Sequence, residues 1–232
     1  MGKRIIQQRR GRGSHTYKVR KKAGIFNPRY PRNLEGEWKV VNLLSSVGHS
    51  VPIAKIMNKE GKIFYNFACN LMYVGQKIKF GGNSNGDISR IGDLKNGTEI
   101  FNVENRSFDG GKFVRSGGNF AVIMNKEKDV VRVLMPSKKE KKFNSNCRAT
   151  VGRAAGAGRV EKPLLKAGKK FYVMKSKSKL WPRTSAVAMN AIDHPFGSGR
   201  GKRVKSKIIK RYAAPGKKVG TLRPKRTGRK KR

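Results

Sequence analysis

The strongest signal in this sequence is its excess of positive charge. The 232 residues include 56 Lys and Arg but 13 Asp and Glu, which gives a formal net charge of +43 at pH 7. A compact body this positive repels itself unless a polyanion neutralises it. We therefore expect a polyanionic partner and not a free-standing enzyme for small molecules. Nucleic acid is the first candidate, and an acidic membrane surface is the second.

The sequence favours nucleic acid over the membrane. Membrane binding by charge needs an amphipathic helix or a lipid anchor beside the basic run, and neither is visible. Apolar runs fall short of the roughly 20 residues of a membrane span, and residues 1–8 have no apolar signal-peptide core. Cys69 and Cys147 match no disulfide framework and no CxxC zinc pattern. We expect a reducing, intracellular compartment.

Most of the charge excess lies near the two ends of the chain. Residues 1–34 hold eleven basic residues and no acid, and residues 201–232 hold fifteen and no acid. Residues 35–146 are nearly balanced, with eighteen basic and eleven acidic residues. The ends are rich in Gly and poor in apolar residues, so alone they cannot bury enough surface to fold. We expect arms that order on nucleic acid; a solubilising or nuclear-import tail is the alternative.

The central body has the pattern of a β structure. Short β-branched and aromatic runs recur from Trp38 to Leu134, and turn-forming residues such as Lys59-Glu60-Gly61 and Asn125-Lys126-Glu127 separate them. Short strands at near-regular spacing are typical of small barrels. No long 3.6-residue apolar period is present, so we expect short helices. The glycine-rich zone 81–86 predicts two barrels in tandem, the first ending near residue 90.

Three glycine-dense stretches carry basic residues: 109–118, 147–159 and 188–201. Glycine lets the backbone approach a crowded surface, and a neighbouring Arg or Lys supplies a phosphate contact. We therefore expect RNA contacts here, although each glycine alone fits a plain turn. None of the stretches matches a phosphate loop or a dinucleotide fingerprint, so we exclude nucleotide hydrolysis.

The same stretches closely resemble one protein family. Val187-Ala188-Met189-Asn190-Ala191-Ile192-Asp193-His194-Pro195, with the glycine-rich loop after it, is similar to the signature of universal large-subunit ribosomal protein number two. Asp109-Gly110-Gly111, Cys147-Arg148-Ala149-Thr150 and Trp181-Pro182-Arg183 resemble the family in the same order. Residues 1–14 resemble its archaeal and eukaryotic cytosolic branch. Where the family usually has Pro, His and Gly, this chain has Ala191, Phe196 and Ser198.

The resemblance implies a mainly β fold of two small barrels in tandem with long basic extensions. We assign residues 1–34 to a basic N-terminal arm, 35–90 to an oligonucleotide-binding-type barrel and 91–170 to an SH3-like barrel. Residues 171–232 are assigned to a glycine-rich loop and a basic C-terminal extension.

The resemblance also implies a function: a structural constituent of the large ribosomal subunit that binds ribosomal RNA. It implies support of subunit association, of transfer-RNA binding and of the architecture around the peptidyl-transferase centre in translation. The implied partners are large-subunit ribosomal RNA and neighbouring ribosomal proteins, with the small subunit and transfer RNA nearby. We expect a cytoplasmic ribosome, with nucleolar assembly in a eukaryote, and neither a membrane nor a homo-oligomer.

The expected RNA contacts come from basic residues of the arms and the glycine-dense stretches, joined by polar and aromatic residues between 181 and 194. They are Arg9, Arg10, Arg12, Lys112, Arg115, Arg148, Arg153, Arg159, Lys162, Trp181, Arg183, Asn190, Asp193, His194, Arg200, Lys202, Arg203, Arg223, Arg226 and Arg229.

His194 is the residue that suggests catalysis, because it lies beside Asp193 and histidine can transfer protons near neutral pH. A lone His without a second acid–base partner lacks the usual catalytic constellation, so we expect it to bind RNA or to shape its loop. The resemblance implies that RNA catalyses peptide transfer. We therefore expect no enzyme activity.

We expect neither a cofactor nor a zinc site, because the His and Cys residues are isolated and structural zinc normally shows paired ligands. Mg²⁺ stays open as an ion that bridges RNA phosphates to the protein, because it prefers oxygen ligands and keeps its waters. An RNA-processing enzyme is a rival hypothesis, but it needs clustered carboxylates, whereas Glu99, Glu104 and Asp109 are scattered. A DNA-compacting protein is the other rival.

The aromatic residues divide into two groups by their neighbours. Those in apolar runs are expected in the core: Phe64, Phe67, Phe101 and Phe120. Those among basic and glycine residues are expected either to stack on unpaired bases or to pack on a neighbouring protein segment: Trp181, Phe196 and Tyr212.

Overall fold

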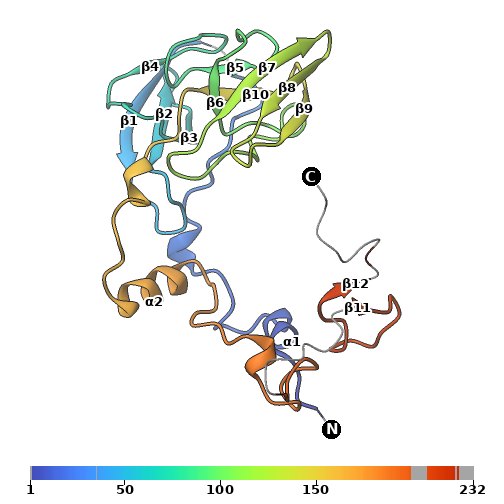
Figure 1. Cartoon of the computed structure of the whole chain (residues 1–232). Helices are drawn as coiled ribbons and strands as arrows, with labels where there is room; N and C mark the ends of the chain where they lie inside the picture. Colours follow the sequence, from blue (N-terminus) through green and yellow to red (C-terminus); the bar gives the residue numbers. More distant parts are fainter. Residues whose placement is uncertain (1, 35, 200–207, 223, 225–232) are drawn as a thin grey trace. The chain divides into compact units, whose positions relative to one another are not determined.

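The structure, a computed structural model, describes residues 2–34, 36–199, 208–222 and 224. The chain divides into two compact units. Unit 1 combines Met1–Val19 with Gly168–Arg232, and unit 2 is Arg20–Ala167. The strands β1 to β10 all lie in unit 2 (Figure 1). Among the described residues, no helix has the length and apolar character of a membrane span.

The first sheet of unit 2 is antiparallel, with the strand order β3-β2-β1-β4. Its strands are β1 (Trp38–Leu44), β2 (Ile53–Asn58), β3 (Ile63–Phe67) and β4 (Lys77–Ile78). A β-bulge lies between Val40 and Asn42, where the pairing with β2 shifts by one residue. A bulge of this kind bends a strand and increases its twist, as a small curved sheet requires.

The second sheet is also antiparallel, with the order β5-β10-β6-β7-β8-β9. Its strands are β5 (Ile88–Arg90), β6 (Glu99–Phe101), β7 (Ala121–Glu127), β8 (Val130–Leu134), β9 (Glu140–Asn144) and β10 (Arg148–Val151).

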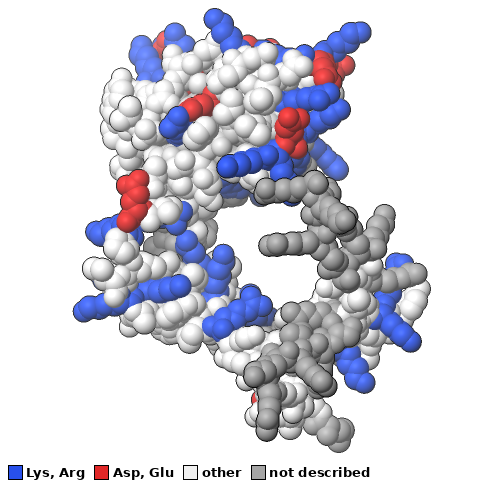
Figure 2. Space-filling view, viewed as in Figure 1, with Lys and Arg blue, Asp and Glu red and all other residues white. Residues whose placement is uncertain are grey.

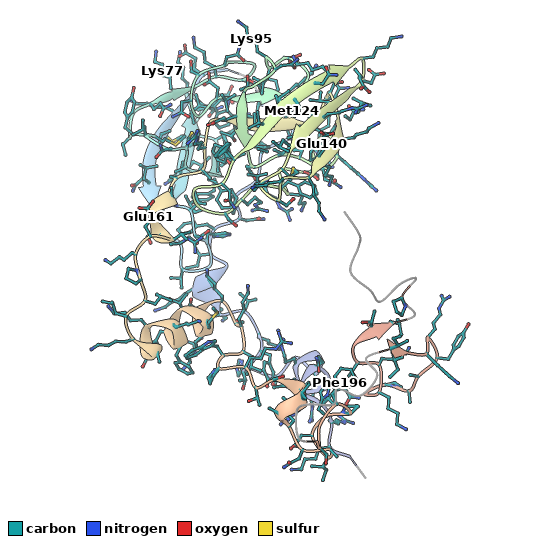
Figure 3. The ribbon with its side chains drawn as sticks, in the orientation of Figure 1. Lys77, Lys95, Met124, Glu140, Glu161 and Phe196 are labelled. Carbon is teal, nitrogen blue, oxygen red and sulfur yellow. The ribbon has the colours of Figure 1, made fainter. Side chains whose placement is uncertain are left out.

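Local details of the second sheet differ from the sequence prediction. Residues 125–127, predicted as a turn, continue β7, because the chain turns at Lys128, which has a φ of 38°. A bulge between Ile123 and Asn125 leaves the intervening Met124 half-exposed (labelled in Figure 3). The first barrel was predicted to end near residue 90, which is the last residue of β5. This strand pairs with β10 and so belongs to the second sheet.

The two sheets share a continuous apolar interior. Ile88 and Phe101 belong to strands of the second sheet but pack in the same cluster as Ile53 and Phe67 of the first. Val114 packs against this cluster and against the second one, which includes Ile100 and Ile123. The prediction of a mainly β fold, an oligonucleotide-binding-type barrel followed by an SH3-like barrel, is confirmed, and the two are joined through their cores.

The aromatic predictions for the core are confirmed at Phe64, Phe67 and Phe101, which are buried. The prediction for Phe120 is wrong. This residue is half-buried, and the guanidinium carbon of Arg153 lies 4.4 Å from its ring centroid. Its ring is therefore covered by a charged side chain at the surface instead of by the apolar cluster.

Residues 20–34, predicted as part of an extended arm, belong to unit 2 because their apolar side chains are buried there. This segment starts with a 3₁₀ turn, η1 (Lys21–Ala23), and its Tyr30 and Leu34 lie in the first apolar cluster. The Tyr30 hydroxyl donates to the carbonyl of Asn102 at 2.9 Å and lies 2.6 Å from Thr150 Oγ1. These contacts attach the segment to the body of unit 2. Burial raises the pKa of the Tyr30 hydroxyl well above its usual value.

Unit 1 has short elements, as predicted from the missing helical period. They are α1 (Ile6–Gly11), α2 (Ala167–Ser176), which starts one residue before the unit boundary, the 3₁₀ turn η3 (Ala186–Ala188) and the parallel pair β11 (Ile208–Ile209) and β12 (Thr221–Leu222). Another 3₁₀ turn, η2 (Ala157–Arg159), lies in unit 2. Among the described residues, unit 1 buries Ile5, Val219 and His194 as side chains larger than glycine. Such a small interior stabilises little by itself.

Candidate nucleic-acid interface

The two units differ sharply in charge. Unit 1 holds twenty-eight of the 56 Lys and Arg residues but one of the 13 acids, Asp193, whereas unit 2 holds twenty-eight basic and twelve acidic residues. In Figure 2 the red acidic side chains lie among the blue basic ones over the strands of unit 2. A surface with one sign of charge attracts a polyanion, and a mixed surface does so weakly. The stronger electrostatic footprint therefore belongs to unit 1.

The predicted contacts at the start of the chain lie on or beside α1. Arg9 and Arg10 are in its last turn, Arg12 is its C-terminal cap, and all three side chains are exposed. The side chain of Gln8 turns back to accept the backbone N–H of Ile5 at 3.1 Å, which satisfies a donor at the other end of the helix. Cations at a helix C-terminus interact favourably with the helix dipole. This short helix therefore presents three arginines without burying them.

Arg148 is not available to RNA, and its prediction as a contact is wrong. Its side chain is 3% exposed and pairs with Glu104, which is 0% exposed. Nη2–H donates to Glu104 Oε1 at 2.7 Å, and Nη1–H donates to the carbonyl of Pro31 at 2.6 Å. A buried charge needs such a partner because isolated charges are costly in the interior. Arg148 joins β10 to the segment before β1.

Glu104 gathers further donors around the same carboxylate. It accepts the backbone N–H of Gly110 at 2.9 Å and that of Phe108 at 3.2 Å. It also accepts the backbone N–H of Arg148 at 2.9 Å. This carboxylate therefore shapes the glycine-dense stretch at 109–118 from the inside. Its role could not be inferred from local pattern, because its partner lies 44 residues away.

Arg115 and Arg153 are held by contacts within the protein. Arg115 is half-buried, its guanidinium carbon lies 4.7 Å from the Phe67 ring centroid, and it donates to the carbonyl of Pro28 at 3.2 Å. Burial lowers the pKa of its guanidinium below the usual value. Arg153 is exposed, but it donates to Glu99 Oε1 at 2.6 Å, which lowers the pKa of that carboxyl. Arg115 is thus partly enclosed by the protein, and the charge of Arg153 is partly neutralised by Glu99.

The first two glycine-dense stretches pack against each other and against nearby loops. A Cβ on Gly118 would lie 2.7 Å from the Cα of Ala157, so these two backbones are in close contact. A Cβ on Gly152 would lie 2.0 Å from Asn85 Oδ1 and 2.7 Å from Cys69 Sγ, and its φ is 103°. Glycine at these positions serves the internal fit of unit 2. The expectation that these two stretches contact RNA stays a prediction, because their internal packing does not test it.

The remaining predicted contacts in unit 2 and at the start of the C-terminal region are at the surface. Lys112, Arg159, Lys162, Arg183 and Asn190 are exposed. Trp181 is half-buried, and Lys170 Nζ lies 5.5 Å from its ring centroid. Tyr212 is 88% exposed.

Six of the predicted contacts lie outside the described residues: Arg200, Lys202, Arg203, Arg223, Arg226 and Arg229.

The third glycine-dense stretch forms a tight loop around His194. The carbonyl of Asn190 accepts the backbone N–H of Asp193 at 3.0 Å and that of His194 at 3.2 Å. Ser198, where the family usually has Gly, has a φ of 63°, a conformation that favours glycine. The His194 ring is buried and meets the Phe196 ring edge-on at 5.1 Å (Phe196 is labelled in Figure 3). The loop is therefore shaped by its own hydrogen bonds.

Residues near the start of the chain line a cavity at this loop, and the sequence prediction did not select them. The cavity encloses about 580 Å³, and Lys3, Arg4 and Lys217 are among its lining residues together with His194. The backbone N–H of Lys3 donates to the carbonyl of Ile192 at 2.9 Å, and Lys3 Nζ lies 3.8 Å from Asp193 Oδ1. Their basic character was visible in the sequence, but the pairing of residues 2–8 with residues 191–195 was not.

α2 was also absent from the predicted contacts. It carries Lys169, Lys170 and Lys175, and among its described residues none is buried. The rings of Phe171 and Tyr172 meet edge-on at 5.6 Å, and Lys175 Nζ lies 5.6 Å from the Phe171 ring centroid. Basic and aromatic side chains at the surface suit contact with phosphates and unstacked bases.

The cysteines and the metal-ligating residues do not gather. Cys69 and Cys147 are free and buried, and burial raises the pKa of the Cys69 thiol to about 11. Within the described parts of the chain, no three His, Cys, Asp or Glu side chains come close enough together to hold a metal ion.

Comparison with known proteins shows close similarity to one family. Residues 84–213 match the family described as Ribosomal Proteins L2, C-terminal domain. The chain is 41% identical over 235 residues to a protein of Archaeoglobus fulgidus, with 98% of this chain and 99% of the relative covered. It is 42% identical over 240 residues to a protein of Hyperthermus butylicus, with 100% of both chains covered. A protein of Saccharolobus islandicus is 43% identical over 236 residues, with 99% of both chains covered. Each relative is named large ribosomal subunit protein uL2.

Proposed function

Since the chain belongs to the ribosomal protein L2 family, we propose that it is a structural constituent of the large ribosomal subunit that binds ribosomal RNA. The observation that carries this proposal is the charge of unit 1, which has twenty-eight basic residues and one acid, and few of its described side chains are buried. Such a unit gains stability when a phosphate polymer neutralises it. The relatives share the name large ribosomal subunit protein, which favours the RNA of that subunit as the phosphate polymer.

The two units divide the work of binding. Unit 2 is a packed β body whose buried pairs, such as Arg148 with Glu104, hold its loops in place without RNA. It docks as a preformed shape, which suits the recognition of folded RNA by its phosphates and 2′-hydroxyls. Unit 1 presents exposed cations on α1 and α2 that release counterions from phosphates. It thereby holds neighbouring RNA segments at fixed positions.

Membership of the family supports finer roles, which are part of the same proposal. We place the protein in a cytoplasmic ribosome, next to other ribosomal proteins, where it supports subunit association, transfer-RNA binding and the RNA architecture around the peptidyl-transferase centre. It acts by binding and not by catalysis. The Nδ1 of His194 already accepts the backbone N–H of Phe196 at 3.0 Å, so this nitrogen is engaged in shaping the loop.

Binding at matched salt tests the proposal. The full-length chain is titrated with a large-subunit ribosomal RNA transcript and with duplex DNA of equal length, from 50 to 400 mM salt. We expect preference for the RNA and a log–log salt slope of about −0.7 to −0.9 for each phosphate contact. Preference for the duplex DNA would refute the proposal, as would an endogenous chain that fails to sediment with the large subunit.

A matched pair of variants locates the contacts. Changing Arg9, Arg10 and Arg12 on α1 to Gln removes three exposed cations from unit 1. Changing Lys138, Lys139 and Lys142, which are exposed near β9 of unit 2, removes the same charge from the mixed surface. We expect the first variant to reduce the salt slope by about 2 to 3 and the second to reduce it by less. An equal reduction would remove the distinction between the two units.

A further inference from the structure

His194 is buried, at 5% exposure, yet it lines two cavities within unit 1. The larger encloses about 580 Å³ and the smaller about 380 Å³. Both fall within the roughly 300–1,000 Å³ that is typical of small-molecule sites. The larger one is lined by residues from 2–8, 191–195 and 209–217, so three separate stretches of the chain line one open cavity.

The hydrogen bonds of the loop fix which ring nitrogen of His194 is a donor. The backbone N–H of Phe196 donates to Nδ1 at 3.0 Å, so Nδ1 carries no proton and the neutral ring is protonated at Nε2. Among the described residues, Nε2 has no hydrogen-bond partner. The buried side-chain atoms that lack a partner within the described part of the chain are Gln76 Oε1, Asn102 Oδ1 and Arg132 Nε, so Nε2 is not among them and is accessible. The Nε2–H group is thus available to a ligand.

The walls of the larger cavity combine two kinds of chemistry. The apolar lining residues, here called the apolar wall, are Ile5, Ile192, Pro195, Ile209 and Pro215, and the cationic ones, here called the cationic rim, are Lys3, Arg4 and Lys217. The single acid of unit 1, Asp193, has its Oδ1 3.8 Å from Lys3 Nζ and so offsets part of one charge. The rim as a whole stays positive. It favours an anion that also carries an apolar surface.

We propose that the larger cavity holds one unpaired nucleotide unit, with its base against the apolar wall and its phosphate at the cationic rim. The base accepts a hydrogen bond from His194 Nε2, since every nucleobase offers ring nitrogen or carbonyl acceptors. Phosphate contacts position a nucleotide, whereas base contacts provide discrimination between bases. The assignment of RNA as the source of this unit rests on the proposed function, although the same chemistry accepts a free nucleotide.

An acidic peptide is the competing occupant, and the cavity favours it less. Its carboxylates pair with the cationic rim, but an acidic side chain offers no flat apolar surface for the five residues of the apolar wall. A nucleotide satisfies the wall, the rim and the Nε2–H donor together. The three kinds of contact therefore point to a nucleotide.

The His194 ring itself reports occupancy. The full-length chain is labelled with ¹⁵N-histidine, and its three histidines, His15, His49 and His194, are followed by long-range ¹H–¹⁵N spectra. The probes are the four 5′-nucleoside monophosphates, inorganic phosphate, a short single-stranded oligoribonucleotide and a glutamate-rich peptide. We expect the monophosphates and the oligoribonucleotide to shift the Nε2 signal of His194 and to leave His49 unchanged. Inorganic phosphate and the peptide are expected to leave the His194 signal in place.

Variants separate the contributions. His194→Phe keeps a ring of similar size but removes the donor, and we expect about tenfold weaker binding of the best monophosphate. His49→Phe makes the same change in unit 2 and is expected to leave this binding unaltered. Lys217→Gln leaves the hydrogen bonds of the His194 loop intact, so it keeps the test valid if His194→Phe disturbs the loop. It should weaken the monophosphates but not the parent nucleosides.

Each contrary outcome has a distinct meaning. If no nucleotide shifts His194 while the chain still binds ribosomal RNA, the nucleotide cavity is refuted and the proposed function stands. If the glutamate-rich peptide shifts Nε2 as strongly as a monophosphate does, the cavity is a peptide site and the inference is also refuted. Equal binding by free monophosphates and by the oligoribonucleotide keeps the cavity but removes RNA as its preferred source. If the unaltered chain does not bind ribosomal RNA at all, the proposed function is refuted instead.

Discussion

Removing the charge of Glu104 should destabilise unit 2 strongly. Glu104→Gln keeps the shape of the side chain but leaves the guanidinium of Arg148 buried beside a neutral group. Both side chains are almost fully enclosed, at 0% and 3% exposure. Breaking a buried ion pair on one side costs about 3–5 kcal/mol. For a unit of this size each kcal/mol lowers the melting temperature by about 2–4 °C, so we expect a drop of roughly 6–20 °C.

The matched control is Glu99→Gln. Glu99 also pairs with an arginine, Arg153, through two oxygens, but the side chains are 32% and 54% exposed. Water screens that pair, so its loss should destabilise far less. A double variant, Glu104→Gln with Arg148→Met, removes both buried charges and should recover much of the stability, because apolar replacement of a buried pair is often neutral.

Tryptophan fluorescence measures the effect in the intact chain. The protein has two tryptophans, Trp38 in unit 2 and Trp181 in unit 1. In a Trp181→Phe background, the buried Trp38 reports the unfolding of unit 2 alone. The reasoning fails if Glu104→Gln costs no more than Glu99→Gln. It also fails if the double variant loses a phosphate contact, seen as a salt slope for RNA reduced by about 0.7 to 0.9, because Arg148 would then contact RNA.

Three further predictions test other parts of the structure. Gly152→Ala should destabilise unit 2 by more than about 2 kcal/mol in chemical denaturation, because its Cβ would lie 2.0 Å from Asn85 Oδ1. The control is Gly97→Ala, which has a similar φ but open space around the added Cβ, and so measures the backbone strain alone. Burial lowers the pKa of His49, so as the pH falls the unfolded state binds a proton at this ring before the folded state does. The free energy of unfolding should therefore fall as the pH drops below about 6.5, and His49→Gln should flatten this part of the stability profile. The Cys69 thiol, with its pKa raised to about 11, should resist alkylation at pH 8 until denaturant unfolds the chain, as a thiol assay would show.

The sequence predicted the features that depend on local pattern and on total charge. The strands around Phe64 and Phe101 were visible as short β-branched and aromatic runs, and the two successive sheets follow from the glycine-rich break between them. The resemblance to the L2 family, found in motifs such as Cys147-Arg148-Ala149-Thr150, is confirmed by relatives that match the chain over nearly its whole length. Local pattern was sufficient here because alternation and turn chemistry act within a few residues.

Features that depend on distant partners were not predictable in this way. Arg148 looked like a phosphate ligand because its neutralising partner, Glu104, is remote in sequence. Phe120 looked like a core residue because the sequence does not show that Arg153 covers it. Segment 20–34 had the composition of an arm, yet Tyr30 finds its place through groups that fold far along the chain. In each case the tertiary partner decided the role.

The tie made by Tyr30 has a consequence for how the protein is made. Its hydroxyl meets Thr150, which is 120 residues further along the chain. During synthesis, the early segment therefore leaves the exit tunnel long before the strand that encloses it exists. Contacts between such distant residues are slow to form, and unsatisfied apolar surface is prone to aggregation meanwhile. Tyr30 and Leu34 of the nascent chain therefore lack their final partners until β10 has emerged and the two barrels can close.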